Sequence, residues 1–152
     1  MNLQDAKALA ELLLEEYGLD QQGWTFDWHS LKKVAGRCNY VARLITLSHS
    51  YASHNDERLV ENTLRHEVAH ALVGPGQHHN QVWKRKALEV GCTAERCVSS
   101  ETVYPMAKYT LSCSTCGKTY QFHRRPAGAK GCGVCSPRRF DPRFVLTVTQ
   151  NW

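Results

Sequence analysis

Hydrophobic residues recur at helical spacing in three stretches of the chain. In residues 3–17 the apolar positions lie three or four apart, and Gly18 is a natural helix end. A second apolar stripe follows the capping residues and early acids of Ser53–Glu57 and stops at the Gly-Pro-Gly of 74–76. A third helix is expected over 80–90. We therefore predict three amphipathic helices, each with one face toward a core.

Other stretches favour strands. Trp24, Phe26 and Trp28 alternate with polar residues, and residues 40–47 are rich in Val, Leu, Ile and Thr. We expect these two strands to pair, with a turn around 33–37 between them. Short strands joined by turns containing Cys and Gly are predicted later in the chain, at 109–112, 119–124 and 144–149. The fold class is therefore α+β, with a small sheet.

Composition narrows the class of protein. The chain has 152 residues, of which 42% are hydrophobic and 22% charged, as in ordinary globular proteins. No apolar run approaches the roughly 18 residues of a membrane span, and the N-terminus lacks the pattern of a secretory signal. The seven Cys are an odd number, which fits thiols that bind metal or stay free in a reducing compartment. We expect a cytoplasmic monomer without membrane contact.

Charge divides the chain in two. Residues 1–103 carry a net charge of −2, whereas residues 104–152 carry +7 and contain Asp141 as their single acid. We therefore expect one domain over 1–103 and a basic module over 104–152.

The second helix carries the sequence His66-Glu67-Val68-Ala69-His70. Positions four apart share a helix face, so His66 and His70 can hold one metal ion together. Glu67 lies one residue along and can reach a water on that metal without being a ligand. This H-E-x-x-H pattern is typical of zinc metalloproteases.

A catalytic zinc ion takes three protein ligands and keeps a fourth position open. His78 and His79 follow the Gly-Pro-Gly turn, and Glu89 is a rival separated from His70 by eighteen residues. Glu89 stands beside the basic run 84–86, which favours a surface carboxylate. The residues alone leave the third ligand open.

A second metal motif lies in the basic module. It consists of two C-x-x-C pairs separated by fifteen residues, formed by Cys113, Cys116, Cys132 and Cys135. Four thiolates complete a tetrahedron, so the predicted site is a structural zinc ribbon. A module this short buries too little apolar surface to be stable without such an ion. We thus expect two Zn²⁺ per chain, one catalytic and one structural.

Cations and aromatic residues alternate around these cysteines. Lys and Arg can contact phosphates, and exposed rings can stack on bases, so we expect a surface for single-stranded or structured DNA. Its best candidates are Arg124 and Arg125 beside Phe122, together with Lys118. The alternative is that the aromatic residues form the small core of the ribbon and the charges only solvate it.

The segment 64–71 followed by His79-Asn80-Gln81-Val82-Trp83 resembles the SprT-like family, as does the Gly36-Arg37-Cys38 segment before 44–48. That family includes the Spartan proteases of DNA–protein crosslink repair and short bacterial and phage versions. The resemblance implies a zincin-like fold in which His66, His70 and His79 hold the catalytic zinc. It also implies that Glu67 is the acid/base and that Trp83 packs the third helix against the second. Asn80 departs from the Gly usual at its position.

The resemblance further implies a zinc metalloendopeptidase that cleaves proteins bound or crosslinked to DNA. Such an enzyme would act at the bacterial nucleoid or, if it is encoded by a phage, in the cytoplasm of the host cell. Two alternatives remain open: a non-catalytic DNA-binding zinc adaptor and a zinc hydrolase of a non-protein amide. The other cysteines, Cys38, Cys92 and Cys97, are interpreted as buried or free thiols.

Overall fold

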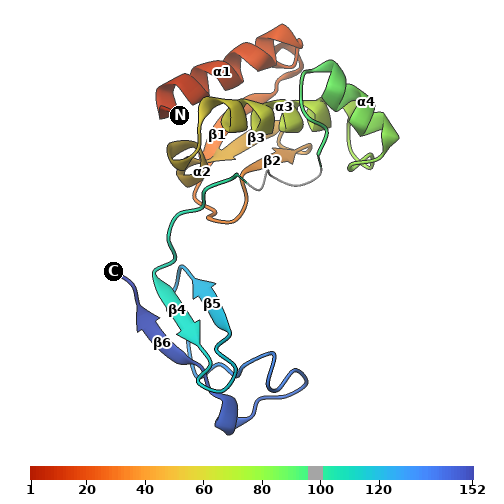
Figure 1. The fold of residues 1–152 in the computed structure, drawn as a ribbon. Coiled ribbons are helices and arrows are strands. Elements are labelled where there is room, and N and C mark those ends of the chain that lie inside the picture. Colours follow the sequence, from red (N-terminus) through yellow and green to blue (C-terminus); the bar gives the residue numbers. More distant parts are fainter. Residues whose placement is uncertain (96–100) are drawn as a thin grey trace. The chain divides into compact units, whose positions relative to one another are not determined.

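The computed structural model describes residues 1–95 and 101–152, and Cys97 lies outside these described residues. The chain forms two compact units, Met1–Pro105 and Met106–Trp152. The first contains four α-helices: α1 (Leu3–Glu16), α2 (His49–His54), α3 (Glu57–Val73) and α4 (Gln81–Glu89). It also contains a 3-10 turn at Asp20–Gln22 and the strands β1 (Thr25–His29), β2 (Gly36–Asn39) and β3 (Leu44–Ser48). This unit is of the mixed α+β class (Figure 1).

The sheet of the first unit has the order β1-β3-β2, with β3 in the centre. β1 runs parallel to β3, with Thr25 opposite Leu44, and β2 runs antiparallel to β3, with Gly36 opposite Leu47. The second strand expected from sequence does pair with the first, but it begins at Leu44 rather than residue 40. The edge strand β2 was missed, because residues 36–39 fall where a turn was predicted.

Residues 40–43 form the turn between β2 and β3. The Asn39 Oδ1 atom accepts hydrogen bonds from the backbone N–H groups of Val41 and Ala42, each at 3.1 Å. Arg43 adopts a left-handed conformation with φ of 48°. A short polar side chain that bonds its own backbone favours a turn over a strand. The local chemistry of Asn39 therefore ends β2 and delays the start of β3.

Two apolar clusters hold the helices in place. The larger one lies between the sheet and the helices α1 and α3, and includes the buried residues Leu13, Leu47 and Leu64. The smaller one joins α3 to α4 through Ala69, Trp83, Ala87, Val90 and Cys92. Because these residues pack together, the face of α3 that carries Ala69 is fixed against α4. This packing also fixes how far the side chains of α3 lie from those of the segment that contains α4.

The second unit is a three-stranded antiparallel sheet of order β5-β4-β6. Its strands are β4 (Tyr109–Ser112), β5 (Thr119–Phe122) and β6 (Thr147–Gln150). The predictions for the last two strands were too long at one end. β5 ends at Phe122, and a 3-10 turn at Pro142–Phe144, capped by the Asp141 side chain, delays the start of β6. Proline fixes φ and lacks an N–H group, so the chain at Pro142 suits a turn better than a ladder.

Candidate metal centres and basic surface

Three imidazole rings meet in the first unit. Their Nε2 atoms are 3.2 Å apart for His66 and His70, and 3.1 Å apart for each of the two pairs that include His79. His66 and His70 lie one turn apart on α3, and His79 comes from the segment just before α4. Nitrogens bound to one tetrahedral zinc ion at about 2.0–2.1 Å lie about 3.3–3.4 Å from one another. The three atoms therefore fit the ligand positions of one zinc ion.

Burial keeps the two helical rings neutral. Burial first, and then the charges of neighbouring imidazoles, lower the pKa of His66 to about 3 and the pKa of His70 to about 4. A neutral ring has a free lone pair, which a metal ligand requires. The protein thus presents these nitrogens ready to bind a cation.

The loop before α4 explains why His79 joins the cluster and His78 does not. His78 adopts a left-handed conformation with φ of 44°, which turns the chain so that His79 faces α3. Asn80 is the N-cap of α4, and its Oδ1 atom accepts hydrogen bonds from the N–H groups of Val82 and Trp83. The rival Glu89 lies outside the cluster and bonds to the Lys86 Nζ atom at 2.7 Å.

Trp83 forms the floor of the three-histidine cluster. Its side chain is fully buried, and its ring centroid lies 4.6 Å from that of His66, 5.1 Å from that of His70 and 4.6 Å from that of His79. Contact with all three rings restricts their rotation, so Trp83 orients the three imidazoles as well as packing α4 against α3.

Glu67 is buried on the side of α3 that faces β2. The side chain is 7% exposed, and burial raises the pKa of this carboxyl group to about 8, opposed by the Arg37 guanidinium. Strand β2 approaches it at Gly36, where an added Cβ atom would lie 2.8 Å from the Glu67 Oε1 atom and 3.0 Å from the Thr63 Cγ2 atom. The close approach of backbone to carboxylate explains why position 36 is glycine.

We expect Gly36→Ala to destabilise the chain by about 1–3 kcal/mol, because the new methyl group overpacks the contact with Glu67. Denaturant titration of the variant against the wild type measures the change. The matched test repeats the substitution in a Glu67→Ala background, where the clash with the carboxylate is absent and the penalty becomes smaller. An equal penalty in both backgrounds contradicts the assigned contact.

Four cysteine sulfurs meet in the second unit, where Cys113, Cys116, Cys132 and Cys135 form the other cluster found among the described residues. The Sγ atoms are 3.8 Å apart for Cys113 and Cys135, and 3.6 Å apart for Cys116 and Cys132. Sulfurs at about 2.3 Å from one tetrahedral zinc ion lie about 3.8 Å apart. This cluster is compatible with a zinc ribbon.

Tyr120 supports the cysteine cluster in a way that the sequence did not indicate. Its hydroxyl group lies 3.7 Å from the Cys132 Sγ atom and accepts a hydrogen bond from the Gly133 N–H group. The backbone N–H groups of Cys135 and Val134 lower the pKa of Cys132 to about 6, which favours the thiolate that binds metal. Tyr120 therefore belongs to the cysteine cluster, where its hydroxyl group is hydrogen-bonded.

The predicted DNA-contacting residues come from both ends of β5. Phe122 ends β5 and is 36% exposed, and Arg124 and Arg125 follow after His123 with exposed side chains. Lys118 precedes β5 and stands six positions before Arg124, up to about 20 Å along an extended chain. Tyr109 and Tyr120 pack against the ribbon core with Leu111, whereas Phe140 is 55% exposed. The aromatic residues thus divide between core and surface.

The two remaining described cysteines lie near Glu67 in the first unit. Burial and the Glu67 charge raise the pKa of Cys38 on β2 to about 12. Burial also raises the pKa of Cys92, which packs behind Trp83. Both thiols therefore stay protonated at neutral pH.

Comparison with known proteins gives one match. The sequence model of the SprT-like family matches residues 6–104. Comparison with curated proteins and with solved structures gives no match. Within residues 1–95 and 101–152, no helix is long and apolar enough to cross a membrane.

Proposed function

Because the chain belongs to the SprT-like family, which indicates a metalloprotease-type domain, we propose that it is a zinc metalloendopeptidase with a zincin-like first unit. The single observation that carries this proposal is the convergence of three histidine Nε2 atoms, with the buried Glu67 next to His66 in the sequence of α3. Three nitrogen ligands leave a tetrahedral ion one open position, as catalytic zinc sites require.

A zinc ion at the three histidines would polarise a scissile carbonyl group and acidify a water molecule toward a pKa of about 7. Glu67 follows His66 directly on α3. We infer from this position that its carboxylate reaches the open position without being a ligand. In peptide hydrolysis Glu67 takes the water proton as the new C–O bond forms. It then delivers that proton to the amide nitrogen as the C–N bond breaks.

The elevated pKa of Glu67 suits this exchange of protons. Burial favours the protonated carboxyl group, whereas a nearby dication favours the carboxylate. The two influences oppose each other, so the group can accept a proton and release it within one reaction cycle. The Arg37 guanidinium also favours the carboxylate, because its charge lowers the pKa of Glu67.

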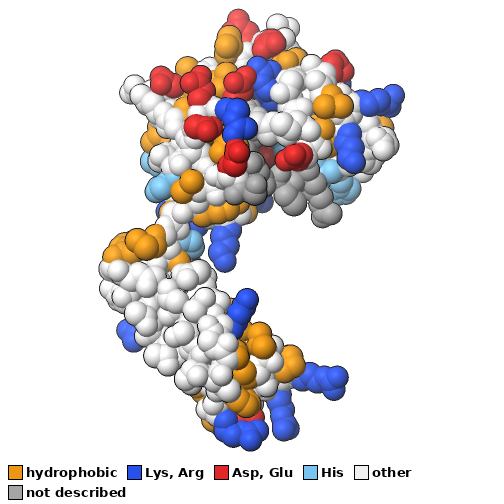
Figure 2. All heavy atoms as spheres, in the orientation of Figure 1, with side chains coloured by type: hydrophobic (Ala, Val, Ile, Leu, Met, Phe, Trp, Pro, Cys, Tyr) orange, Lys and Arg blue, Asp and Glu red, His pale blue; other side chains and the backbone are white. Residues whose placement is uncertain are grey.

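We further propose that the basic second unit binds DNA, single-stranded or structured, and that the substrates are proteins bound or crosslinked to it. The support is the net charge of +7 carried after residue 103 and the exposed group of Phe122, Arg124 and Arg125. Figure 2 shows Lys and Arg side chains of this unit in blue on its visible face. Phosphate contacts by such cations are tolerant of sequence.

Cleavage of casein or a histone by the zinc-loaded chain, with and without single-stranded DNA, tests the proposed function. We expect fragments on a denaturing gel, and more of them when DNA is present. A chain that holds two zinc ions, binds DNA and cleaves neither protein would contradict the peptidase and support the adaptor.

Arg124→Glu combined with Arg125→Glu is expected to weaken binding to single-stranded DNA and to flatten its salt dependence. Loss of two phosphate contacts reduces the slope of log K against log salt by about 1.4. Fluorescence anisotropy at several salt concentrations measures both quantities. The matched control is Lys84→Glu with Arg85→Glu on α4, which changes the net charge equally at exposed positions of the first unit. An equal loss in both variants would show that total charge, and not this surface, governs binding.

A further inference from the structure

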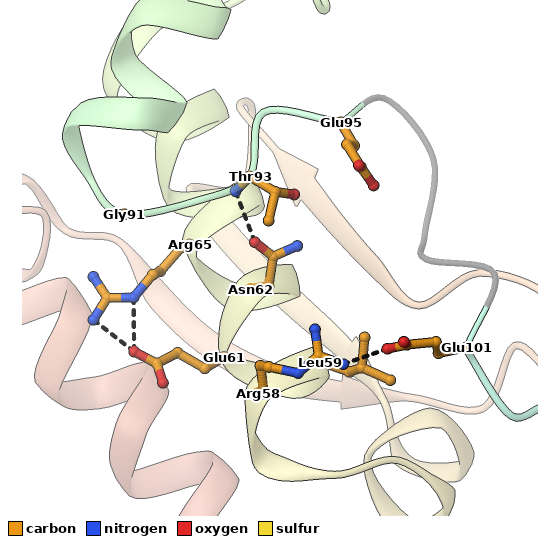
Figure 3. A pocket seen from close by; sticks show the side chains of 9 residues that line it. All are labelled: Arg58, Leu59, Glu61, Asn62, Arg65, Gly91, Thr93, Glu95 and Glu101. Atoms are coloured by element: carbon orange, nitrogen blue, oxygen red, sulfur yellow. Dashed lines mark hydrogen bonds and ion pairs between the residues drawn. The ribbon is translucent and has the colours of Figure 1, made fainter.

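The pocket beside α3 in the first unit is lined by charged side chains that pair with one another. Figure 3 shows Arg65 bonded to Glu61 and Arg58 bonded to Glu101. Both guanidinium charges are therefore balanced within the protein. The hydroxyl group of Tyr120 in the second unit is different, because it faces a cysteine sulfur that carries its charge in the form that binds metal.

The contacts of Tyr120 determine the direction of its hydrogen bond to Cys132. The hydroxyl oxygen accepts the Gly133 backbone N–H group at 3.2 Å, and it lies 3.7 Å from the Cys132 Sγ atom. A thiolate bound to a metal ion has no proton and can only accept a hydrogen bond. With the site loaded, the single proton of the hydroxyl group is therefore donated to the sulfur.

Burial makes this donor valuable to Cys132. Cys132 is fully buried, whereas Cys116 of the same cluster is exposed. A buried thiolate is shielded from water and depends on hydrogen-bond donors within the protein. Hydrogen bonds to a charged acceptor are about twice as strong as those between neutral groups. The Tyr120 hydroxyl group thus stabilises the form of Cys132 that binds metal.

Tyr120 also connects two parts of the second unit that are distant in sequence. It lies on β5, and its partners Cys132 and Gly133 stand 12 and 13 positions later in the chain. An added Cβ atom at Gly133 would lie 3.6 Å from the hydroxyl oxygen, which is van der Waals contact. The second C-x-x-C pair is thereby held against β5. A ligand that is already in place loses less freedom when the metal ion binds.

We propose that Tyr120 is a positioning residue of the cysteine site, whose hydroxyl group donates a hydrogen bond to the zinc-bound thiolate of Cys132. This inference rests on the proposed structural zinc site. Tyr120 itself binds no metal ion. It acts through Cys132, by holding the sulfur in place and by drawing electron density from it.

Tyr120→Phe removes the hydroxyl group and keeps the ring that packs in the core of the second unit. We expect the zinc affinity of the cysteine site to fall about tenfold, the lower end of the effect of losing an outer partner of a metal ligand. Zinc titration of the full chain against a chelating indicator measures this change. The step that disappears in Cys132→Ser identifies the cysteine site, and the histidine site of the same chain serves as internal reference.

Cobalt in place of zinc reports on the hydrogen bond itself. Loss of the donor raises the electron density on sulfur, so the sulfur-to-cobalt charge-transfer band is expected at longer wavelength in Tyr120→Phe. The histidine site offers no sulfur ligand and does not contribute to this band.

Tyr109→Phe is the matched control, because Tyr109 packs in the same core and its hydroxyl group contacts no cysteine sulfur within residues 1–95 and 101–152. It is expected to leave both the affinity and the band unchanged. A tenfold loss in Tyr120→Phe with an unmoved band would assign the effect to packing and overturn the inference, as would an unchanged affinity. A wild-type chain without any sulfur-to-cobalt band would overturn the proposed cysteine site instead.

Discussion

Glu67→Gln is expected to reduce cleavage of casein or histone by about 10²–10⁴-fold, the contribution of a general base in the transition state. Glutamine keeps the shape of the side chain but cannot take up the proton of water. Because Glu67 is not one of the three converging histidines, the variant is expected to bind two zinc ions per chain, the number also expected for the wild type. Cleavage rates and zinc content of the same preparations measure both expectations.

Measuring the stability of Glu67→Gln distinguishes a loss of catalysis from a loss of folding. Glu67 is buried and its pKa is raised to about 8, so a neutral amide at this position costs the folded state no more than the carboxylate does. We therefore expect an unchanged or higher melting temperature. Glu57→Gln, an exposed position in the first turn of α3, is the control for loss of one carboxylate from the same helix. Full cleavage by Glu67→Gln would remove Glu67 from the mechanism even if the zinc site stands.

Much of the clustering of the histidines and cysteines could be predicted because it depends on local spacing. His66 and His70 share a face whenever residues 57–73 are helical, and the apolar stripe of that segment makes it so. In the same way, the short sequence spacing within each C-x-x-C pair brings its two cysteines close together in the second unit. The choice between His78 and His79 was open from the residues alone, because it depends on the φ of 44° at His78.

The elements that were missed depend on partners distant in sequence. β2 reads Gly36-Arg37-Cys38-Asn39, which has no apolar alternation, and it is a strand because it pairs with β3. α2 has six residues, fewer than two turns, and begins at the capping side chain of Ser48.

Cys132→Ser is expected to unfold the second unit while the first stays folded. The buried core of residues 106–152 consists of Leu111, Leu146 and the two cysteines Cys113 and Cys132, so half of it consists of proposed metal ligands. Structural zinc supplies about 10–16 kcal/mol in small zinc-binding peptides, which exceeds the roughly 3–5 kcal/mol that a core this small provides. Backbone amide NMR measures the outcome as lost dispersion for residues 106–152, with one zinc ion per chain remaining.

Cys38→Ser is the matched control, because it replaces a half-buried thiol of the first unit that lies outside the four-cysteine cluster. It is expected to keep both zinc ions and the dispersed signals of β4, β5 and β6. The comparison also tests the independence of the two units. If Cys132→Ser broadened the signals of α3 and α4 as well, folding of the first unit would depend on the ribbon. If the variant kept two zinc ions and an ordered sheet, the four sulfurs would not be the ligands that hold the second unit together.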